Sequence, residues 1–209
     1  MSQTGPEGHP DRHEWDERYA DAPVWSGRPN GALVAEVEHL APGRALDVGC
    51  GEGADAVWLA EGGWRVTAVD VSAVAVERGR AAASSAGLEI DWRVAGLLDL
   101  DPGSTHDLVS AQYPALRRTP DQAAERALLG AVAPGGTLLV VTHADVDRAA
   151  ALEHGFDPDE YVGHGQVRAA LDAAGQAWVV EVDERRQRHV EGGGGAHHTH
   201  DLVLRAHRA

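Results

Sequence analysis

Residues 46–54 read LDVGCGEGA, and this stretch limits the possible folds more than any other part of the chain. An apolar run leads into three closely spaced glycines, Gly49, Gly51 and Gly53, and a helix-forming segment begins directly afterwards. This order predicts a buried parallel strand that stops at a glycine turn and opens a helix. Glycines allow positive φ angles and close ligand approach, and the first amides of a helix stay unpaired. We therefore expect a small ligand on this turn.

The rest of the chain alternates strands with helices, which predicts a doubly wound α/β fold with a parallel sheet. Asn30 and Ser72 are the expected N-caps of the helices that follow them. The last two predicted strands are joined by a loop too short for a parallel crossover, so they form an antiparallel hairpin. The expected strands are residues 45–48, 65–69, 89–94, 106–111, 137–142, 178–188 and 199–208.

A chain of 209 residues suits one α/β domain with a sizeable core. Residues 1–12 contain too little apolar material to fold and are predicted to be a disordered lead-in, followed by a single domain over residues 13–209. Within that domain, residues 13–43 are expected to form an N-terminal helical lid. Their aromatic side chains, including the candidate substrate contacts Tyr19 and Trp25, either cover a pocket or cover the edge of the sheet.

The formal net charge of −15 argues against a nucleic-acid partner, because phosphate binding needs a surplus of lysine and arginine. No apolar run is long enough for a membrane helix, and the polar start lacks a signal peptide, so we expect a cytoplasmic protein. The single cysteine, Cys50, excludes an intramolecular disulfide. A small-molecule partner follows as the expectation, while the oligomeric state stays open.

The glycine turn and a later acid together predict an adenosine cofactor. Asp70 ends the next strand about 20 residues after the glycines, where a carboxylate can accept both ribose hydroxyls. Asp47 lies just before the turn, where an anion would repel a pyrophosphate and attract a cationic ligand. This favours S-adenosylmethionine over a nicotinamide cofactor. A nicotinamide-dependent oxidoreductase, which needs a further substrate domain, is the alternative enzyme.

LDVGCGEG, the VTAVDVS stretch, the APGG turn and the terminal hairpin together resemble the class I S-adenosylmethionine-dependent methyltransferases. The early W-x3-Y pattern, Trp25, the Pro29-Asn30 helix start and GADAVWLAEGGWRVTAVD are similar to the tellurite-resistance and thiopurine methyltransferase group, whose members modify small molecules. The resemblance implies a Rossmann-like seven-stranded sheet in the order 3-2-1-4-5-7-6 with strand seven antiparallel.

The resemblance also implies roles for residues of the cofactor site. Asp47 would act near the methionine amine, Asp70 would hold the ribose, and backbone would approach closely at the glycines. Gly96 occupies a place where an aspartate is common, so either Asp99 substitutes for it or the adenine contact is lost. The expected cofactor-binding residues are Asp47, Gly49, Cys50, Gly51, Asp70, Val71, Gly96, Leu97, Ala111 and Gln112.

A methyl transfer by in-line displacement requires alignment above all, and it requires a base only when the acceptor loses a proton. The catalytic candidates are His143, Tyr113 and His189, with His143 as the expected general base because its neutral form is available at pH 7. A loop histidine in water is the competing interpretation. Arg186 is expected to attract an anionic acceptor.

Histidines near the chain end raise a different possibility. His198 and His200 would share one face of a strand with His189 across from them, which is a spacing that metal ligands use. We predict no metal here, because polar hairpin tips are commonly solvated, but a non-catalytic cofactor- or metal-binding protein remains a third hypothesis. The identity of the acceptor does not follow from fold and cofactor.

Overall fold

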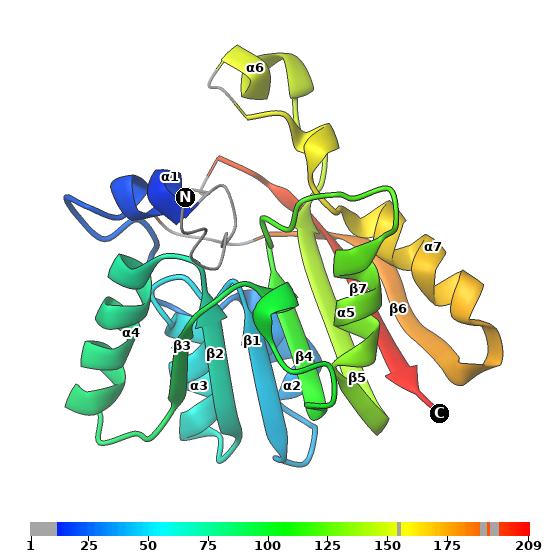
Figure 1. Ribbon diagram of the computed structural model, residues 1–209, viewed down its shortest axis with the longest axis horizontal. Helices are drawn as coiled ribbons and strands as arrows, with labels where there is room; N and C mark the ends of the chain where they lie inside the picture. The colour runs from blue at the N-terminus through cyan, green and yellow to red at the C-terminus, as the bar shows by residue number, and fades with distance from the viewer. Residues whose placement is uncertain (1–11, 154–155, 189–191, 193–196) are drawn as a thin grey trace, which may run out of the picture.

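The computed structural model describes residues 12–153, 156–188, 192 and 197–209, and its centre is a seven-stranded sheet (Figure 1). The strand order is β3-β2-β1-β4-β5-β7-β6, and β7 runs antiparallel to both of its neighbours, as predicted. The strands are β1 (Arg44–Val48), β2 (Arg65–Asp70), β3 (Asp91–Val94), β4 (His106–Gln112), β5 (Val132–His143), β6 (Trp178–Gln187) and β7 (His200–Arg208).

Helices cover both faces of this sheet, with α2 and α3 behind it and α5 and α7 in front of it in Figure 1. Among the described residues, no helix is both long enough and apolar enough to cross a membrane. The α-helices are α1 (Arg12–Arg18), α2 (Gly31–Val37), α3 (Ala54–Glu61), α4 (Ala73–Ser85), α5 (Ala123–Gly130), α6 (Arg148–Glu153) and α7 (His164–Ala174). Short 3-10 turns occur at Leu97–Asp99, Pro158–Glu160 and Gly175–Ala177.

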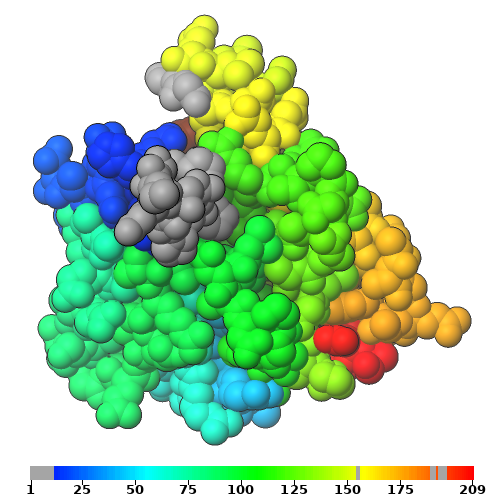
Figure 2. Space-filling view, in the orientation of Figure 1, coloured from blue at the N-terminus to red at the C-terminus, as the bar shows by residue number. Residues whose placement is uncertain are grey.

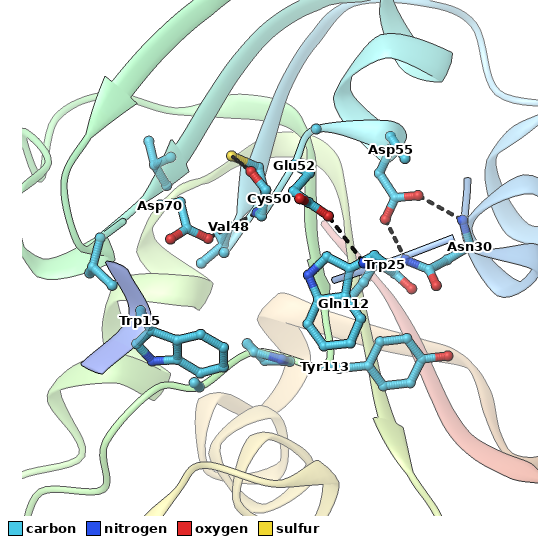
Figure 3. Close-up of a pocket in the computed structure, with 18 of the residues that line it drawn as sticks. Trp15, Trp25, Asn30, Val48, Cys50, Glu52, Asp55, Asp70, Gln112 and Tyr113 are labelled. Atoms are coloured by element: carbon cyan, nitrogen blue, oxygen red, sulfur yellow. Dashed lines mark hydrogen bonds between the residues drawn. The ribbon is translucent and has the colours of Figure 1, made fainter. Parts of the chain in front are cut away.

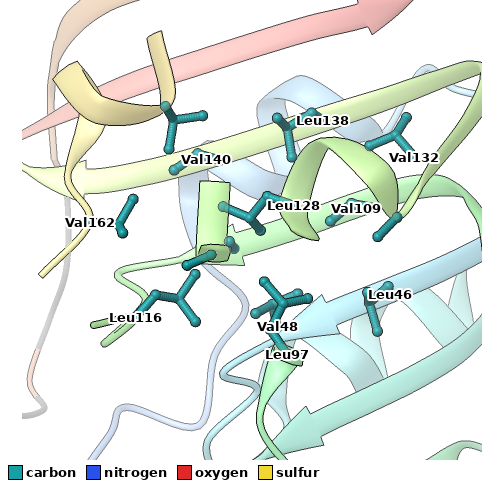
Figure 4. Close-up of a cluster of buried hydrophobic side chains, with 14 of the residues drawn as sticks. Leu46, Val48, Leu97, Val109, Leu116, Leu128, Val132, Leu138, Val140 and Val162 are labelled. Carbon is teal, nitrogen blue, oxygen red and sulfur yellow. The ribbon is translucent and has the colours of Figure 1, made fainter. Parts of the chain in front are cut away.

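Alternate residues of the central strands feed two separate apolar clusters. On β5, Leu138 and Val140 pack in the cluster that includes Leu128 of α5, which Figure 4 shows. The intervening residues of β5 pack on the opposite face with side chains of α2 and α3. Successive strand side chains point to opposite faces, so an unbroken apolar run is what a sheet covered on both sides requires. This two-sided burial holds the strand ends, and thereby the site, in place.

Several expected boundaries move by a few residues. β5 begins at Val132 instead of residue 137, because Val132 already pairs with His106 across a register irregularity.

Ser72 caps α4 as expected, since its hydroxyl accepts from the Ala75 amide. Asn30 sits at the N-cap position of α2, but its side chain makes no cap hydrogen bond and is used elsewhere. The lead-in predicted for residues 1–12 lies almost entirely outside the described residues, and α1 already begins at Arg12.

The segment before α2 lies over the end of the sheet at which β1, β2 and β4 finish (Figure 1). Figure 2 shows the surface of this N-terminal segment at the same end of the molecule as the segment that contains α6. In open α/β sheets, ligands bind at the carboxyl ends of the strands. The N-terminal segment therefore lies at the end of the sheet where ligands bind in folds of this kind.

Candidate cofactor and acceptor site

A cavity opens at the carboxyl ends of β1, β2 and β4, beneath the N-terminal segment (Figure 3). Most residues predicted to bind cofactor or substrate line it, although they come from separate parts of the chain. The predicted residues that line the cavity are Tyr19, Trp25, Gly49, Cys50, Gly51, Asp70, Val71, Gly96, Leu97, Gln112, Tyr113 and His143. The sequence pattern thus located one continuous site at the sheet end.

The glycine turn has the backbone geometry that its sequence predicts. Gly49, Gly51 and Gly53 have φ angles of 69°, 52° and 84°, values that side-chain-bearing residues rarely adopt. A Cβ atom on Gly49 would meet nothing within 4 Å, whereas one on Gly51 would lie 3.1 Å from the Tyr19 hydroxyl. The space beside Gly49 is therefore open to a ligand, and the space beside Gly51 is shared with the aromatic cover.

Asp70 is fixed at the rim of this turn by main-chain amides. Its Oδ2 accepts from the Gly51 amide at 2.9 Å, and its Oδ1 accepts from the Ser72 amide at 2.8 Å. Burial raises the pKa of Asp70, while these amide hydrogen bonds favour the charged form and oppose that rise. The carboxylate is thus held in one orientation, with its remaining lone pairs available for hydroxyl donors in the cavity.

Two further carboxylates lie close to the turn. Asp47 is only 1% exposed and does not line the cavity among the described residues, and its Oδ2 has no hydrogen-bond partner among them. Burial raises the pKa of Asp47 well above its usual range, and the charges of Asp55 and Asp70 raise it further. A cationic ligand in the cavity would relieve this repulsion.

Asp55, at the start of α3, does line the cavity, and Figure 3 shows the glycine turn between it and Asp70. Its two oxygens accept from the backbone and side-chain amides of Asn30, at 2.7 and 2.6 Å. Burial raises the pKa of Asp55, and the Asn30 hydrogen bonds oppose that rise. Asn30 therefore joins α2 to the glycine turn instead of capping its own helix.

The end of β4 presents an unsatisfied acceptor to the cavity. Gln112 donates from Nε2 to the Ser110 hydroxyl at 3.0 Å, and its buried Oε1 has no partner among the described atoms. Ala111, also predicted to contact the cofactor, is fully buried in the core and does not line the cavity. Cys50 lines the cavity, but burial raises the pKa of its thiol well above the usual range, which makes it a poor nucleophile.

The loop after β3 places Asp99 away from the cavity that Gly96 lines. Asp99 is exposed, and its Oδ2 accepts from the Gly96 amide at 2.8 Å. It lies at the end of a 3-10 turn, and the cavity lining includes Gly96 and Leu97 but not Asp99. Gly96 and Leu97, and not the Asp99 carboxylate, therefore lie at the wall of the cavity.

The aromatic cover is attached to the glycine turn through a side chain inside the motif itself. Glu52 Oε2 accepts from the amides of Val24 and Trp25, each at 3.0 Å, and its Oε1 accepts from Arg78 at 2.8 Å. Trp25 in turn donates from its indole nitrogen to the Tyr19 hydroxyl at 2.7 Å. Both of these aromatic residues line the cavity. Glu52 of the glycine turn thus attaches the N-terminal segment to the turn.

A second group of side chains lies across the cavity from Asp70, around Tyr113. The Tyr113 and His143 rings stack at a centroid distance of 4.2 Å, and His198 stacks on the other face of His143 at 3.8 Å. Tyr113 has a φ of 51°, an uncommon value for a residue with a side chain, at the point where β4 ends. Tyr113, His143 and Arg188 all line the cavity.

Other predicted residues lie away from the cavity. Arg186 does not line it, because its guanidinium pairs with Glu36 and Glu184. His189 lies outside the described residues. His198 stacks on His143 rather than lining the cavity, and the described residues contain no group of three or more metal-ligating side chains. The cavity-lining cation at this end of β6 is Arg188, two residues beyond the predicted Arg186.

Sequence reasoning missed Glu52, Asp55 and Asp201 and selected Arg186 over its neighbour Arg188, although a signal existed for Glu52 and Asp55. Glu52 and Asp55 lie within or directly after the glycine motif, where an acid that serves no phosphate needs another partner. Arg188 and Asp201 reach the site only through pairing of β5, β6 and β7, which no local pattern encodes.

Comparisons with known proteins agree with this geometry. Residues 45–136 match the family model described as a methyltransferase domain. The chain is also similar to the ubiquinone biosynthesis O-methyltransferase of Xanthomonas euvesicatoria pv. vesicatoria, with 35% identity over 117 residues. That match covers 54% of this chain and 48% of the relative, so the chain spans about half the length of this curated relative.

Two solved structures share the fold over nearly the whole chain. The N-methyltransferase NodS from Bradyrhizobium japonicum, in complex with S-adenosyl-L-homocysteine, has a TM-score of 0.70 and 19% identity and covers 96% of this chain and 99% of its own. A structure from work on the conversion of a disulfide bond into a thioacetal group in echinomycin biosynthesis has a TM-score of 0.73 and 24% identity, covering 95% and 91%. At these identities the two structures show the fold alone, and the methyltransferase-domain match adds residues 45–136.

Proposed function

We propose that this chain transfers a methyl group from S-adenosylmethionine to a small-molecule acceptor. The observation that carries the proposal is Asp70, whose carboxylate is fixed beside the Gly51 amide at the rim of the glycine turn. A ribose needs such an acceptor, and the open backbone at Gly49 leaves room for the rest of the cofactor. Residues 13–43 would act as the lid over the bound pair, held by Glu52.

Two buried side-chain oxygens without partners in the described part of the chain, that of Gln112 in the cavity lining and that of Asp47 outside it, fit the charge at the methionine end of this cofactor. Buried polar atoms in proteins nearly always have partners, and Gln112 Oε1 and Asp47 Oδ2 have none among the described atoms. An ammonium group supplies donors and positive charge, and the sulfonium adds a second positive charge. The positive charge of the cofactor would then offset the mutual repulsion of three neighbouring carboxylates, Asp47, Asp55 and Asp70.

S-adenosylmethionine, when bound, supplies an electrophilic methyl group, so the protein mainly aligns the acceptor and excludes water. The aromatic cover formed by Trp15, Tyr19 and Trp25 would do both, since all three side chains line the cavity. His143 would take a proton from an acceptor that has one to lose. The three catalytic candidates from the sequence are His143, Tyr113 and His189. In this proposal only His143 acts as the base, and Tyr113 packs beside it.

The acceptor group is the finer part of the proposal. The named activity of the ubiquinone biosynthesis relative is an O-methylation, and we extend to this chain only the idea of a small organic acceptor. Membership of the tellurite-resistance and thiopurine group rests on the N-terminal aromatic pattern and remains a proposal. We also propose a cytoplasmic location, in line with a single cysteine in the whole chain.

Equilibrium dialysis with tritium-labelled S-adenosylmethionine, alongside a fluorescence titration with NADH, tests the proposed cofactor. We expect saturable binding of S-adenosylmethionine, competition by S-adenosylhomocysteine, and no change with NADH. Saturable NADH binding without retention of S-adenosylmethionine would instead support the oxidoreductase alternative and overturn the proposal.

A further inference from the structure

Asp201, the second residue of β7, lies directly opposite His143 of β5 in the antiparallel pair. Its side chain is buried, with 4% of the residue exposed, and it belongs to no part of the cofactor motif. A buried carboxylate is costly unless its oxygens are paired. The partners of Asp201 therefore indicate why an acid stands at this position.

Only one of the two oxygens of Asp201 is satisfied. Oδ2 accepts from the Tyr113 hydroxyl at 2.8 Å, and the Tyr113 oxygen accepts from Arg188 Nε at 3.0 Å. Oδ1 is buried without a hydrogen-bond partner among the described atoms. It lies 3.5 Å from Nδ1 of His143, which is itself buried and without a partner. Two orphaned polar atoms thus face each other just beyond hydrogen-bond length.

The surroundings of the His143 ring leave one edge for the cavity. Tyr113 covers one face of the ring and His198 covers the other. The Nδ1 edge is buried against Asp201, yet the side chain as a whole keeps 20% exposure and lines the cavity. The accessible part of the ring is therefore the edge that carries Nε2.

The other polar groups around His143 are already committed. Burial and the neighbouring charge of Asp201 raise the pKa of the Tyr113 phenol, so this hydroxyl keeps its proton and donates it to Asp201. Burial lowers the pKa of His198 to about 4, so it stacks on His143 as a neutral ring. Arg188 and His197 complete the charged and titratable groups of this cluster among the described residues.

We propose that Asp201 is a positioning residue that holds His143 with its proton on Nδ1 and the Nε2 lone pair toward the acceptor. This inference rests on the proposed methyltransferase function. Tyr113 and Arg188 orient the carboxylate, and the contact with Nδ1 tightens when an acceptor fills the cavity, as catalytic hydrogen bonds commonly do. The arrangement commits the site to acceptors that lose a proton, and specifically to phenolic hydroxyls.

The chemistry of this step explains the choice of acceptor. The phenol oxygen forms the new bond to the methyl carbon, the carbon–sulfur bond breaks with its electron pair on sulfur, and the phenol proton moves to Nε2 of His143. A phenol with a pKa of about 10 stays protonated at neutral pH, so its methylation benefits from a base. An aromatic thiol ionises without one. The indole of Trp25, which lines the cavity, suits a planar ring.

The first test reads the histidine directly and needs no cofactor. Nitrogen-15 NMR of labelled protein, with His143→Gln to assign the signal, reports which ring nitrogen carries the proton. We expect the Nδ1-protonated form in the wild type and a shift toward the Nε2-protonated form in Asp201→Asn, whose amide can donate to Nδ1. Asp183→Asn is the matched control, because Asp183 pairs with His164 away from the cavity. A wild-type His143 protonated on Nε2 would overturn the positioning role.

The second test compares catechol with thiophenol as methyl acceptors under saturating S-adenosylmethionine. We expect Asp201→Asn to lower kcat for catechol about 10-fold or more and to change thiophenol methylation less than 2-fold, with Asp183→Asn like the wild type. An equal loss of kcat for both acceptors in Asp201→Asn would contradict the proposal. A wild-type protein that methylates thiophenol but not catechol would contradict it as well. Dialysis with labelled S-adenosylmethionine separates these results from a failure of the cofactor assignment, since Asp201→Asn should bind it normally.

Discussion

The two halves of the cavity are built in different ways. The half around Asp70 comes from two short stretches at the ends of adjacent strands, because the glycine turn after β1 and the end of β2 supply both its amides and its acids. The half around His143 is assembled from the ends of β4, β5 and β6 and the start of β7, which are far apart in sequence. The first half recognises a ligand mainly through backbone, whereas the second does so through side chains. We infer that the first holds the cofactor and the second handles the acceptor.

This division can be broken first at His143, where we expect the largest effect. His143→Gln removes the base while keeping a planar polar side chain, so kcat with a phenolic acceptor should fall roughly 100-fold or more. The dissociation constant for S-adenosylhomocysteine should change less than 2-fold, because His143 stacks on Tyr113 and not on the glycine turn. Steady-state kinetics and calorimetry measure the two quantities. An unchanged kcat with catechol would remove His143 from the chemistry.

The converse change, in the cofactor half, is Asp70→Asn. An amide cannot accept from both the Gly51 and Ser72 amides, and it loses the charge that attracts ribose hydroxyls. Affinity for S-adenosylhomocysteine should fall by about 1.5–3 kcal/mol, the usual contribution of a charged hydrogen-bonding group. Calorimetry gives the affinity, and thermal unfolding checks that the fold persists. Asp91→Asn, at an exposed acid on β3, serves as the control.

The lid connects the two halves, and Glu52 tests that connection. Glu52→Gln can keep one oxygen for both backbone amides, which bind the same carboxylate oxygen, but it loses the charge and the oxygen that pair with Arg78. Because a charged hydrogen bond contributes about 1.5–3 kcal/mol and part of it survives, we expect S-adenosylhomocysteine to dissociate several-fold faster. Stopped-flow tryptophan fluorescence follows the rate. Glu77→Gln, which loses only an exposed ion pair with Arg80, should leave it unchanged.

The smallest expected effect concerns stability and pH. The raised pKa of Asp47 means that the folded state binds a proton more tightly than the unfolded state does. The free energy of unfolding of the ligand-free protein should therefore fall as pH rises from the unfolded pKa, near 4, through the folded pKa. Asp47→Asn should remove this slope and stabilise the ligand-free protein by about 1 kcal/mol at neutral pH, at the expense of cofactor affinity.

Urea unfolding of Asp47→Asn and wild type between pH 5 and pH 8, together with calorimetry, measures both effects. A variant that is less stable than the wild type at pH 8 would show that Asp47 is held by partners rather than strained by burial.

Sequence patterns reached further into the first half of the cavity than into the second. The strand order and antiparallel β7 followed from the alternation, the resemblance and the short hairpin loop, and Ser72 was placed correctly as a cap. The glycine turn carries its own conformational signal, so its geometry is local information. Asn30 shows the limit of such reasoning, since its amides donate instead to Asp55, which lies beyond α2 and β1 in the chain.

The side chains of the acceptor half could not be predicted from the sequence, for a physical reason. Arg186 and Arg188 both carry the charge that an anionic group prefers, and alternation along one strand does not distinguish between them. Which of them reaches the cavity depends on Glu36 of α2, which binds Arg186 from another layer of the fold. The proximity of Asp201 to His143 follows only from the strand register, which pairs the two residues. Side chains that meet through tertiary pairing leave no spacing in the sequence.

One measurement tests the central claim most directly, namely titration of S-adenosylhomocysteine into the wild type, Asp70→Asn and His143→Gln by calorimetry. We predict that the wild type and His143→Gln bind with the same affinity within 2-fold, and that Asp70→Asn binds at least about 10-fold more weakly. No binding by the wild type would contradict the cofactor assignment. Equal weakening in both variants would contradict the division of the cavity into a cofactor half and an acceptor half.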